Sequence, residues 1–393
     1  MRARRLLCVG AAVLLAALLW LPCLHLFYLP PRAAAPGAAG LDPEARALLA
    51  THLAAWQAGE AAAADLARLR AANPEWDFMA RTFLVAALAN AALRDPARRA
   101  EHVAAMDRLI AATLSREAES GQRFFLMAYV DRAPFVVPPG RSLFVDGEIA
   151  LMLGLRRLVE EQPAYRPLLA ARVRAMVAQM ERSPVLSGES YPDECWTFCN
   201  TIALAAIRLA DALDGTDHGA LVRGWVAVAR ARLVHPGTGL LVSSYTVEGR
   251  HLEGPEGSSI FLASHALQLV DPAFAREQYE RARRELGRSF LGFGYAREWP
   301  RAWAGRRDVD SGAVVPGLEA GIGASGFMLV AAAAFDDGAT ARRLRATARY
   351  AGFPEERDGR RRYRASNRVG DAVLLYASVL GPAWDEAQRR GRP

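Results

Sequence analysis

Apolar positions recur at helical spacing along most of the chain from Leu41 onwards, and few stretches alternate as strands do. The helical segments come mostly in pairs, and Pro, Gly, Asn or Asp marks the turn within each pair. The pattern predicts six pairs: Trp76–Leu93 with Pro96–Arg116, Phe144–Glu161 with Tyr165–Arg182, Cys195–Leu213 with His218–Val234, Ser258–Val270 with Pro272–Leu286, Leu318–Phe335 with Ala339–Ala351, and Asn367–Leu380 with Ala383–Arg390. A preceding helix, Pro43–Leu69, is expected to pack outside this count.

The two members of each pair differ in their apolar patterning. The first member is apolar on most sides, which is typical of a buried helix, whereas the second is amphipathic and rich in Arg and Glu. Six buried inner helices with six exposed outer helices predict an all-α fold, the (α/α)6 toroid of six helical hairpins. An open solenoid of helix pairs is the alternative. A small β-hairpin is expected from Leu240–Tyr245 and Arg250–Leu252.

The N-terminus carries a long apolar run, since Leu6 to Pro30 contain no formal charge. As a helix this run is about 37 Å long, enough for a single transmembrane helix. Arginines precede it, so the positive-inside rule places the first residues in the cytoplasm and the globular part on the extracytoplasmic side. We expect an anchor in residues 1–30, in contact with the lipid bilayer through residues 6–30, then a linker at 31–40 and the toroid at 41–393. A cleavable signal peptide is the alternative.

Composition removes several classes of function. The 49 basic residues are all arginine, and the absence of lysine excludes Schiff-base catalysis and a Walker A phosphate site. The 42 acidic residues are interspersed with the arginines, so the net charge of +7 indicates a bias towards arginine and no nucleic-acid partner. No His or Cys set has metal-ligand spacing, and no glycine-rich phosphate loop occurs. We therefore expect neither a metal nor a cofactor, and the oligomeric state stays open.

Long loops between the pairs are expected to crowd one mouth of the ring, where the inner helices begin, and to carry function there. The polar and aromatic residues at these starts are the candidates. They include Glu75, Trp76, Asp77, Arg81, Asp146, Glu148, Tyr191, Asp193, Glu194, Cys195, Cys199, Asn200, Tyr245, His251, Glu253, Glu256, Trp299, Trp303, Asp308, Asp310 and Ser311.

Several of these residues have two interpretations. Glu148 lies in an apolar segment bound for the ring interior, so it is either a general acid with a raised pKa or half of a buried pair with an arginine. Asp193 and Glu194 either cap the following helix or act as acid and base. Asp310 either acts in the site or forms salt bridges with neighbouring arginines. Cys199 is either a reactive thiol near a helix N-terminus or a small core residue.

Three segments, PEWDFMARTFLVAALAN, FVDGEIALMLGL and YPDECWTFCN, in this order on a helical toroid, resemble the linalool dehydratase/isomerase family. The resemblance implies an (α/α)6 barrel that needs no cofactor and that moves water and protons on an allylic alcohol. By position, Asp77 matches the active-site aspartate of the family, and Cys199 matches its second cysteine. The chain departs from the family at Phe83, where a tyrosine is expected, at Glu148 in place of a histidine, and at Ser190 near the first cysteine.

Three functions remain open. The first is an exported, membrane-anchored lyase or isomerase acting on a small apolar alcohol or alkene-like molecule. In it Asp77 and Glu148 exchange protons, Cys199 assists, and the substrate-binding candidates are Trp76, Phe83, Tyr191, Trp196 and Tyr245. The second is a glycoside hydrolase or other polysaccharide-acting enzyme that pairs Glu148 or Glu194 with Asp310 and stacks sugars on Trp299 and Trp303. The third is a non-catalytic toroid that binds a partner at its mouth.

Overall fold

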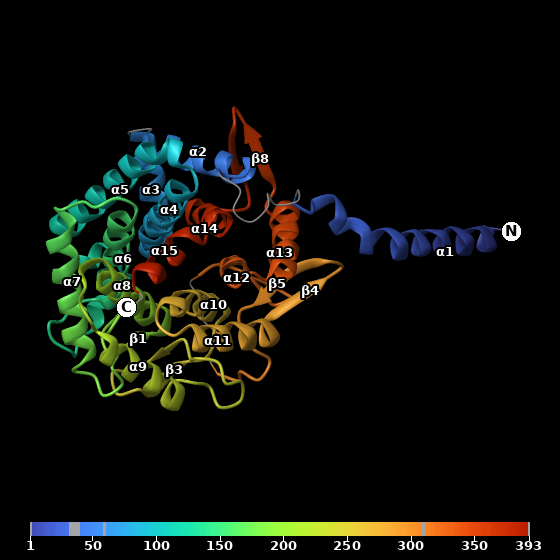
Figure 1. Cartoon of the computed structure of the whole chain (residues 1–393). Helices are drawn as coiled ribbons and strands as arrows, with labels where there is room; N and C mark the ends of the chain where they lie inside the picture. The colour runs from blue at the N-terminus through green and yellow to red at the C-terminus, as the bar shows by residue number, and fades with distance from the viewer. Residues whose placement is uncertain (1, 31–39, 58–59, 306, 308–310, 392–393) are drawn as a thin grey trace.

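The computed structural model describes residues 2–30, 40–57, 60–305, 307 and 311–391. Its helices form a closed ring (Figure 1). Each inner helix contacts the next, and the last of them contacts the first. The predicted (α/α)6 toroid is therefore confirmed, and the open solenoid is excluded. The inner helices are α4 (Pro74–Arg94), α6 (Leu143–Val159), α8 (Thr197–Asp214), α10 (Gly257–Ala266), α12 (Ile322–Ala334) and α14 (Arg368–Val379).

The outer layer differs from the prediction at its sixth position. Five outer helices each follow an inner helix: α5 (Arg99–Ser120), α7 (Tyr165–Met180), α9 (Gly219–Arg232), α11 (Pro272–Glu285) and α13 (Gly338–Ala351). The sixth place is taken from the N-terminal side. The described parts of the expected helix Pro43–Leu69 are α2 (Pro43–Gln57), which contacts α14, and α3 (Glu60–Ala72), which contacts α4; residues 58–59 between them lie outside the described residues. The expectation that this segment packs outside the six pairs was wrong, because its apolar residues are buried against the ring.

The last helix, α15 (Pro382–Arg390), is not the outer partner of α14 that the pattern suggested. It contacts α4, α6 and α8 and lies across their C-terminal ends. The Asn90 side chain accepts a hydrogen bond from the Ala383 backbone at 3.1 Å, and Arg390 donates to the Leu158 carbonyl at 3.3 Å. Helix α15 therefore covers the end of the ring at which the inner helices finish.

Small residues let neighbouring inner helices approach closely. A Cβ atom added at Gly147 on α6 would lie 3.3 Å from the Ala203 Cα atom on α8. One added at Gly154 would lie 2.7 Å from a methyl carbon of Leu209. The seam between α14 and α4 is closed differently, because Arg94 donates to the Val379 carbonyl at 2.8 Å and to the Leu380 carbonyl at 2.6 Å. These carbonyls end α14 and have no partner within the helix.

Short strands join the loops at the mouth of the ring. The expected hairpin is confirmed as β2 (Ser244–Tyr245) and β3 (His251–Glu253), and β1 (Cys195–Trp196) adds a third strand. Helix α8 therefore begins at Thr197, and the expected start at Cys195 was two residues early. A second sheet has the order β4-β5-β7-β6, from β4 (Gly287–Phe290), β5 (Phe293–Arg297), β6 (Val314–Val315) and β7 (Ala320–Gly321). Strands β8 (Pro354–Arg357) and β9 (Arg360–Tyr363) form a separate hairpin.

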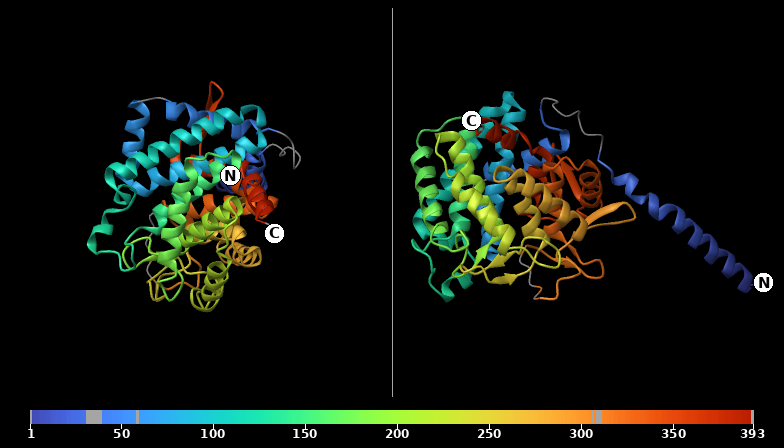
Figure 2. Two further views of the ribbon diagram at one scale, coloured as in Figure 1. Left: turned by 60° about the vertical axis from the view of Figure 1, so that its left-hand side comes forward. Right: turned by 60° about the horizontal axis from the view of Figure 1, so that its bottom comes forward.

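The N-terminal segment extends away from the ring (Figure 2). It consists of α1 (Arg2–Trp20) and the 3-10 helix η1 (Leu21–Tyr28), and neither contains a buried residue. Among the described residues this is the one helix long and apolar enough to cross a membrane, and a signal sequence would have the same properties. The expected linker at 31–40 lies outside the described residues except for its last position. The remaining 3-10 helices are η2 (Pro96–Arg98), η3 (Gln122–Phe125), η4 (Ala128–Arg132) and η5 (Leu267–Leu269).

A buried arginine on α6 offers a test of the ring contacts. The Arg157 side chain is fully buried and binds Asp214 at the end of α8, with a shortest distance of 2.8 Å. Arg166 binds the same carboxylate at 2.8 Å, but 62% of its side chain is exposed. We expect Arg157→Met to lower the free energy of unfolding by about 3 kcal/mol, because it leaves a largely buried carboxylate short of its partner.

The matched control is Arg166→Met, for which we expect a loss below about 1 kcal/mol, as is usual for an exposed ion pair. Urea unfolding of both variants followed by circular dichroism measures the difference. Equal losses would contradict the assignment of Arg157 as the structural cation.

Candidate functional site

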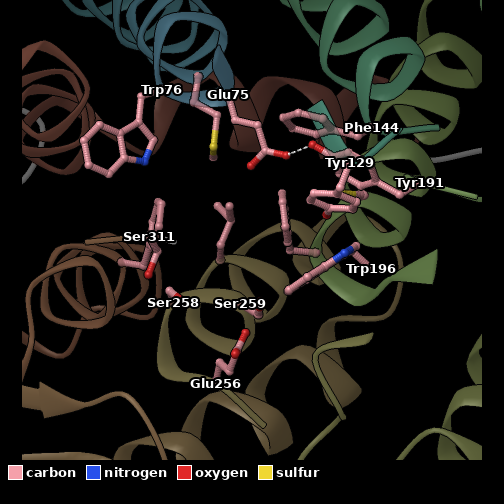
Figure 3. A pocket seen from close by; sticks show the side chains of 15 residues that line it. Glu75, Trp76, Tyr129, Phe144, Tyr191, Trp196, Glu256, Ser258, Ser259 and Ser311 are labelled. Carbon is pink, nitrogen blue, oxygen red and sulfur yellow. Dashed lines mark hydrogen bonds between the residues drawn. The ribbon is translucent and has the colours of Figure 1, made fainter. Parts of the chain in front are cut away.

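A cavity lies at the mouth of the ring where the inner helices begin (Figure 3), the place at which the sequence analysis expected the functional residues. Its empty volume is about 600 Å³, the open mouth included. Aromatic and aliphatic side chains make most of its wall, as in pockets that bind small apolar molecules. The lining residues are Glu75, Trp76, Met79, Tyr129, Phe144, Tyr191, Trp196, Phe198, Cys199, Glu256, Ser258, Ser259, Leu262, Ser311 and Phe327.

A carboxylate and a phenol form the polar end of the cavity. The Asn73 side chain accepts a hydrogen bond from the Glu75 backbone at 2.8 Å and so caps α4, which places Glu75 in its first turn. The Tyr191 hydroxyl donates to the Glu75 carboxylate (Figure 3) and accepts from the Met127 backbone at 2.9 Å. Burial first, and then the charge of Glu75, raise the pKa of Tyr191 far above its usual range. The phenol therefore stays protonated and orients the carboxylate.

Two buried polar side chains hold the loop that carries this phenol. The fully buried Glu189 carboxylate accepts hydrogen bonds from the backbone of Val136 at 2.9 Å and of Asp193 at 2.7 Å. The Asn200 side chain on α8 accepts from the Gly188 backbone N–H at 2.8 Å and donates to its carbonyl at 3.1 Å. The loop is thus tied to two neighbouring segments, and its side chains are fixed at the cavity.

Cys199 reaches the cavity from the first turn of α8 and is 2% exposed. Burial raises the pKa of the Cys199 thiol well above its usual value, and the carboxylates of Glu75, Glu148 and Glu194 add to this. A hydrogen bond with Ser190 acts in the opposite direction but is outweighed. The reactive thiolate considered from its helix position is therefore disfavoured, and the site presents a neutral thiol. Both this cysteine and the buried Cys195 are free.

Glu148 lies on α6 and is 4% exposed. Burial raises its pKa from an ordinary 4.5 to about 7, against a smaller lowering by a hydrogen bond from Thr82. Within the described residues no arginine forms a salt bridge with it, so the structure favours a carboxyl with a raised pKa over a buried pair with an arginine. Glu148 does not line the cavity, but its charge acts on the thiol of Cys199 and on the hydroxyl of Tyr376. It therefore lies behind the cavity wall.

Asp77 and Phe83 are also placed behind the wall. Asp77 is buried and forms a two-bond ion pair with Arg81, at 3.0 and 3.2 Å, one helical turn further along α4. The Phe83 ring packs against Phe327, with 5.6 Å between ring centroids, and Phe327 is the residue that faces the cavity. The two family positions on α4 thus support the lining and do not form it.

The remaining candidates are distributed around the mouth. Trp196 lines the cavity, and its indole N–H donates to Glu194 at 2.7 Å. Asp193 is exposed and accepts from the Val247 backbone at 3.1 Å. Tyr245 is fully buried and shares a hydrogen bond of 2.8 Å with Ser187, away from the lining.

Trp299 and Trp303, the residues expected to stack on sugars, do not line the cavity. Trp303 packs edge-on against His235, with 5.6 Å between the ring centroids. Asp308 and Asp310 lie outside the described residues. The carboxylate pair expected for a sugar-cleaving enzyme, Glu148 or Glu194 with Asp310, therefore stays a prediction.

Two carboxylates were noted at the starts of inner helices but not selected for a role. Glu75 is one, and Glu256, which precedes α10, lies on the facing wall (Figure 3). Their position in or just before the first turn of an inner helix was the feature of the sequence that could have identified them as site residues. Most of the apolar lining, including Phe144, Leu262 and Phe327, was not identified, because buried apolar residues on an inner helix look alike in sequence. Among the described residues no group of three or more His, Cys, Asp or Glu side chains is placed to hold a metal ion.

Comparison with known proteins shows that part of this site lies in a region that matches a known family. The family model for linalool dehydratase/isomerase matches residues 169–369. The match includes the segment with Ser190 and Cys199 and extends over α10 and α12, whereas Asp77 and Glu148 lie outside it. Among solved structures, the GH76 alpha-mannanase of Bacteroides thetaiotaomicron is 10% identical, with a TM-score of 0.42 over 79% of this chain and 87% of that chain.

The titration of Glu148 makes stability depend on pH. The pKa of Glu148 is raised in the folded chain. Its contribution to the free energy of unfolding is therefore fully present below about pH 4.5 and is lost as the pH rises through about 7. We expect Glu148→Gln, which cannot ionise, to raise the free energy of unfolding at pH 8 by up to about 3 kcal/mol relative to the native chain, and by much less at pH 5.

Denaturant unfolding at the two pH values measures this difference. The control is Glu181→Gln, which removes an exposed carboxylate and should have the same small effect at both. A Glu148 variant whose effect does not change with pH would show that the group is ionised throughout.

Proposed function

Because the chain belongs to the linalool dehydratase/isomerase family, we propose that it is an enzyme of lyase or isomerase type that works by acid/base catalysis without a cofactor. Its proposed substrate is a small alcohol or alkene that is apolar over most of its surface. The single observation that carries this is the cavity itself, in which a neutral thiol and a carboxylate–phenol pair face a largely aromatic wall.

In the proposed dehydration, an acid protonates the hydroxyl of the substrate, the C–O bond breaks and water leaves. A base removes a proton from the neighbouring carbon, and the electron pair of that C–H bond forms the new double bond. Cys199 is the proposed proton donor to the substrate, because its thiol lines the cavity. Burial makes this thiol a weak acid, so its proton leaves as the sulfur receives another one. Glu148 stands behind it with a pKa of about 7 and is the proposed source of that proton. The proton that the base takes from the carbon returns to Glu148 through water, which closes the cycle.

Glu75 is the proposed base. Its carboxylate lies in the first turn of α4, where the helix dipole favours negative charge, and Tyr191 holds its orientation. Isomerisation uses the same groups, with water added back at a different carbon. Asp77, which the family resemblance suggested for this role, is bound to Arg81 and becomes a positioning residue of α4 in this proposal.

The proposal includes the location of the enzyme. The segment Arg2–Tyr28 is long and apolar enough to anchor the chain in a bilayer. Arg2, Arg4 and Arg5 precede the apolar run, which supports a cytoplasmic N-terminus and an extracytoplasmic ring. Removal of the segment as a signal peptide is the alternative, and the mass of the mature chain distinguishes the two.

A second candidate function rests on one observation. Glu75 and Glu256 stand on facing walls of the cavity, and two carboxylates on either side of a bond are also what a glycoside hydrolase needs (Figure 3). Trp76 and Trp196 would then be the stacking surfaces, in place of Trp299 and Trp303. The same assays therefore include oligosaccharides.

Single substitutions test the acid and the base. We expect Glu75→Gln and Cys199→Ala each to lower kcat for dehydration of small allylic alcohols by about 10²–10⁴-fold, the usual contribution of a general acid or base. Product formation is measured by gas chromatography, and circular dichroism checks the fold.

Cys195→Ala is the matched control, because this buried thiol does not line the cavity, and it should keep the activity of the native chain. Full activity in both Glu75→Gln and Cys199→Ala would contradict the proposed roles. Cleavage of oligosaccharides without turnover of alcohols would establish the second candidate instead.

A further inference from the structure

The hairpin formed by β4 and β5 ends in an apolar tip. Phe290 at this tip is 57% exposed, and Leu291 and Gly292 make the turn. Figure 1 shows the hairpin extending from the ring on the side from which α1 leaves, and the right-hand view of Figure 2 shows the same relation. Packing within the ring does not explain a phenylalanine at the end of a projecting hairpin.

The tip packs against the end of the N-terminal segment. The His25 ring of η1 meets the Phe293 ring edge-on, with 6.2 Å between centroids, and Tyr28 lies at the same distance from Phe293. Contact at the turn is closer still, because a Cβ atom added at Gly292 would lie 2.3 Å from the His25 imidazole. The position of His25 therefore fixes the position of the tip.

Helix α13 holds the same segment from a second direction. The ring of Tyr350 packs on Tyr28 with 5.0 Å between centroids, and Arg349 donates to the Leu29 carbonyl at 2.9 Å. The exit of the N-terminal segment is thus bound to two elements of the ring, and the direction in which α1 leaves is set by these contacts.

The length of the apolar segment places His25 relative to a bilayer. From Leu6 to Trp20, α1 covers about 22 Å of a hydrocarbon core that is about 30 Å thick. The remaining 8 Å or so takes about four residues of η1, at roughly 2.0 Å per residue of a 3-10 helix, and so ends near Leu24. His25 then lies at the boundary between hydrocarbon and headgroups, and the hairpin tip lies at the same depth.

We infer that the tip of the β4–β5 hairpin, Phe290 with Leu291, inserts into the interfacial layer of the lipid bilayer beside the anchor. The inference rests on the membrane anchor of the proposed function. Phe and Leu side chains on interfacial segments are buried in this layer. The 73% exposed Phe27 of η1, two residues after His25, adds to the apolar surface of the N-terminal segment. With the anchor and the hairpin both in the membrane, the ring is held in one orientation relative to its surface.

Spin labels on the full-length chain test this in vesicles of phosphatidylcholine and phosphatidylglycerol. The background is Cys8→Ser with Cys23→Ser, since the two other cysteines are buried. A label at Phe290→Cys should be more accessible to oxygen, relative to a water-soluble nickel chelate, than a label at Leu252→Cys. Leu252 is a partly exposed leucine on β3, away from α1 in Figure 1, and is the matched control.

A label at Leu14→Cys within α1 reports the anchor separately and should be the most deeply buried in lipid. If it lies in lipid while the Phe290 label is as accessible to the chelate as the Leu252 label, the inference is overturned and the anchor stands. If the Leu14 label lies in water, or is absent from the mature chain, both fail. Dipolar coupling between Phe290 labels of two molecules would show that a second copy covers the tip, which also overturns the inference.

Discussion

The contact between α14 and α4 is the one on which the rest of the ring depends. Every other inner helix packs against neighbours that follow or precede it in the chain, whereas this seam joins the two ends of the series. Arg94 completes it by binding the terminal carbonyls of α14. Once the seam is closed, each inner helix is covered on both flanks, and the N-terminal turns of five inner helices surround one cavity. The site is thus shared by the ring, because its lining comes from α4, α6, α8, α10 and α12.

The ring was predictable because helices that are apolar on all sides have to be buried, and an alternation of such helices with amphipathic ones leaves few arrangements. The positions of α2 and α15 could not be predicted in this way. Helix α15 is short, and what it covers is decided by contacts far away in the sequence, such as Trp384 stacked on His265 with 4.8 Å between ring centroids. The two-residue strand β1 was not predicted for the same reason, since its partner Ser244–Tyr245 lies about fifty residues away in the sequence.

The sequence predicted where the cavity lies but only some of the residues that line it. Trp76, Tyr191, Trp196 and Cys199 line it, whereas Asp77 does not. Helix rotation explains the difference, because Glu75 and Met79 are four residues apart and share one face of α4, while Asp77 and Arg81 share another. A motif fixes the spacing of residues on a helix but not the direction in which the helix is turned. The raised pKa of Glu148 followed from its apolar neighbours alone, and its place behind the wall did not.

The hydrogen bond from Arg94 to Val379 joins residues 285 positions apart, and this has a consequence for biosynthesis. A chain made from its N-terminus presents α4 early, and the face that α14 will cover stays open to solvent until α14 itself has been made. Long-range contacts of this kind slow folding, and an apolar face left open can pair with a neighbouring chain. Between the synthesis of α4 and that of α14, the growing polypeptide is therefore an open arc with an exposed apolar face, and the ring closes only once α14 is present.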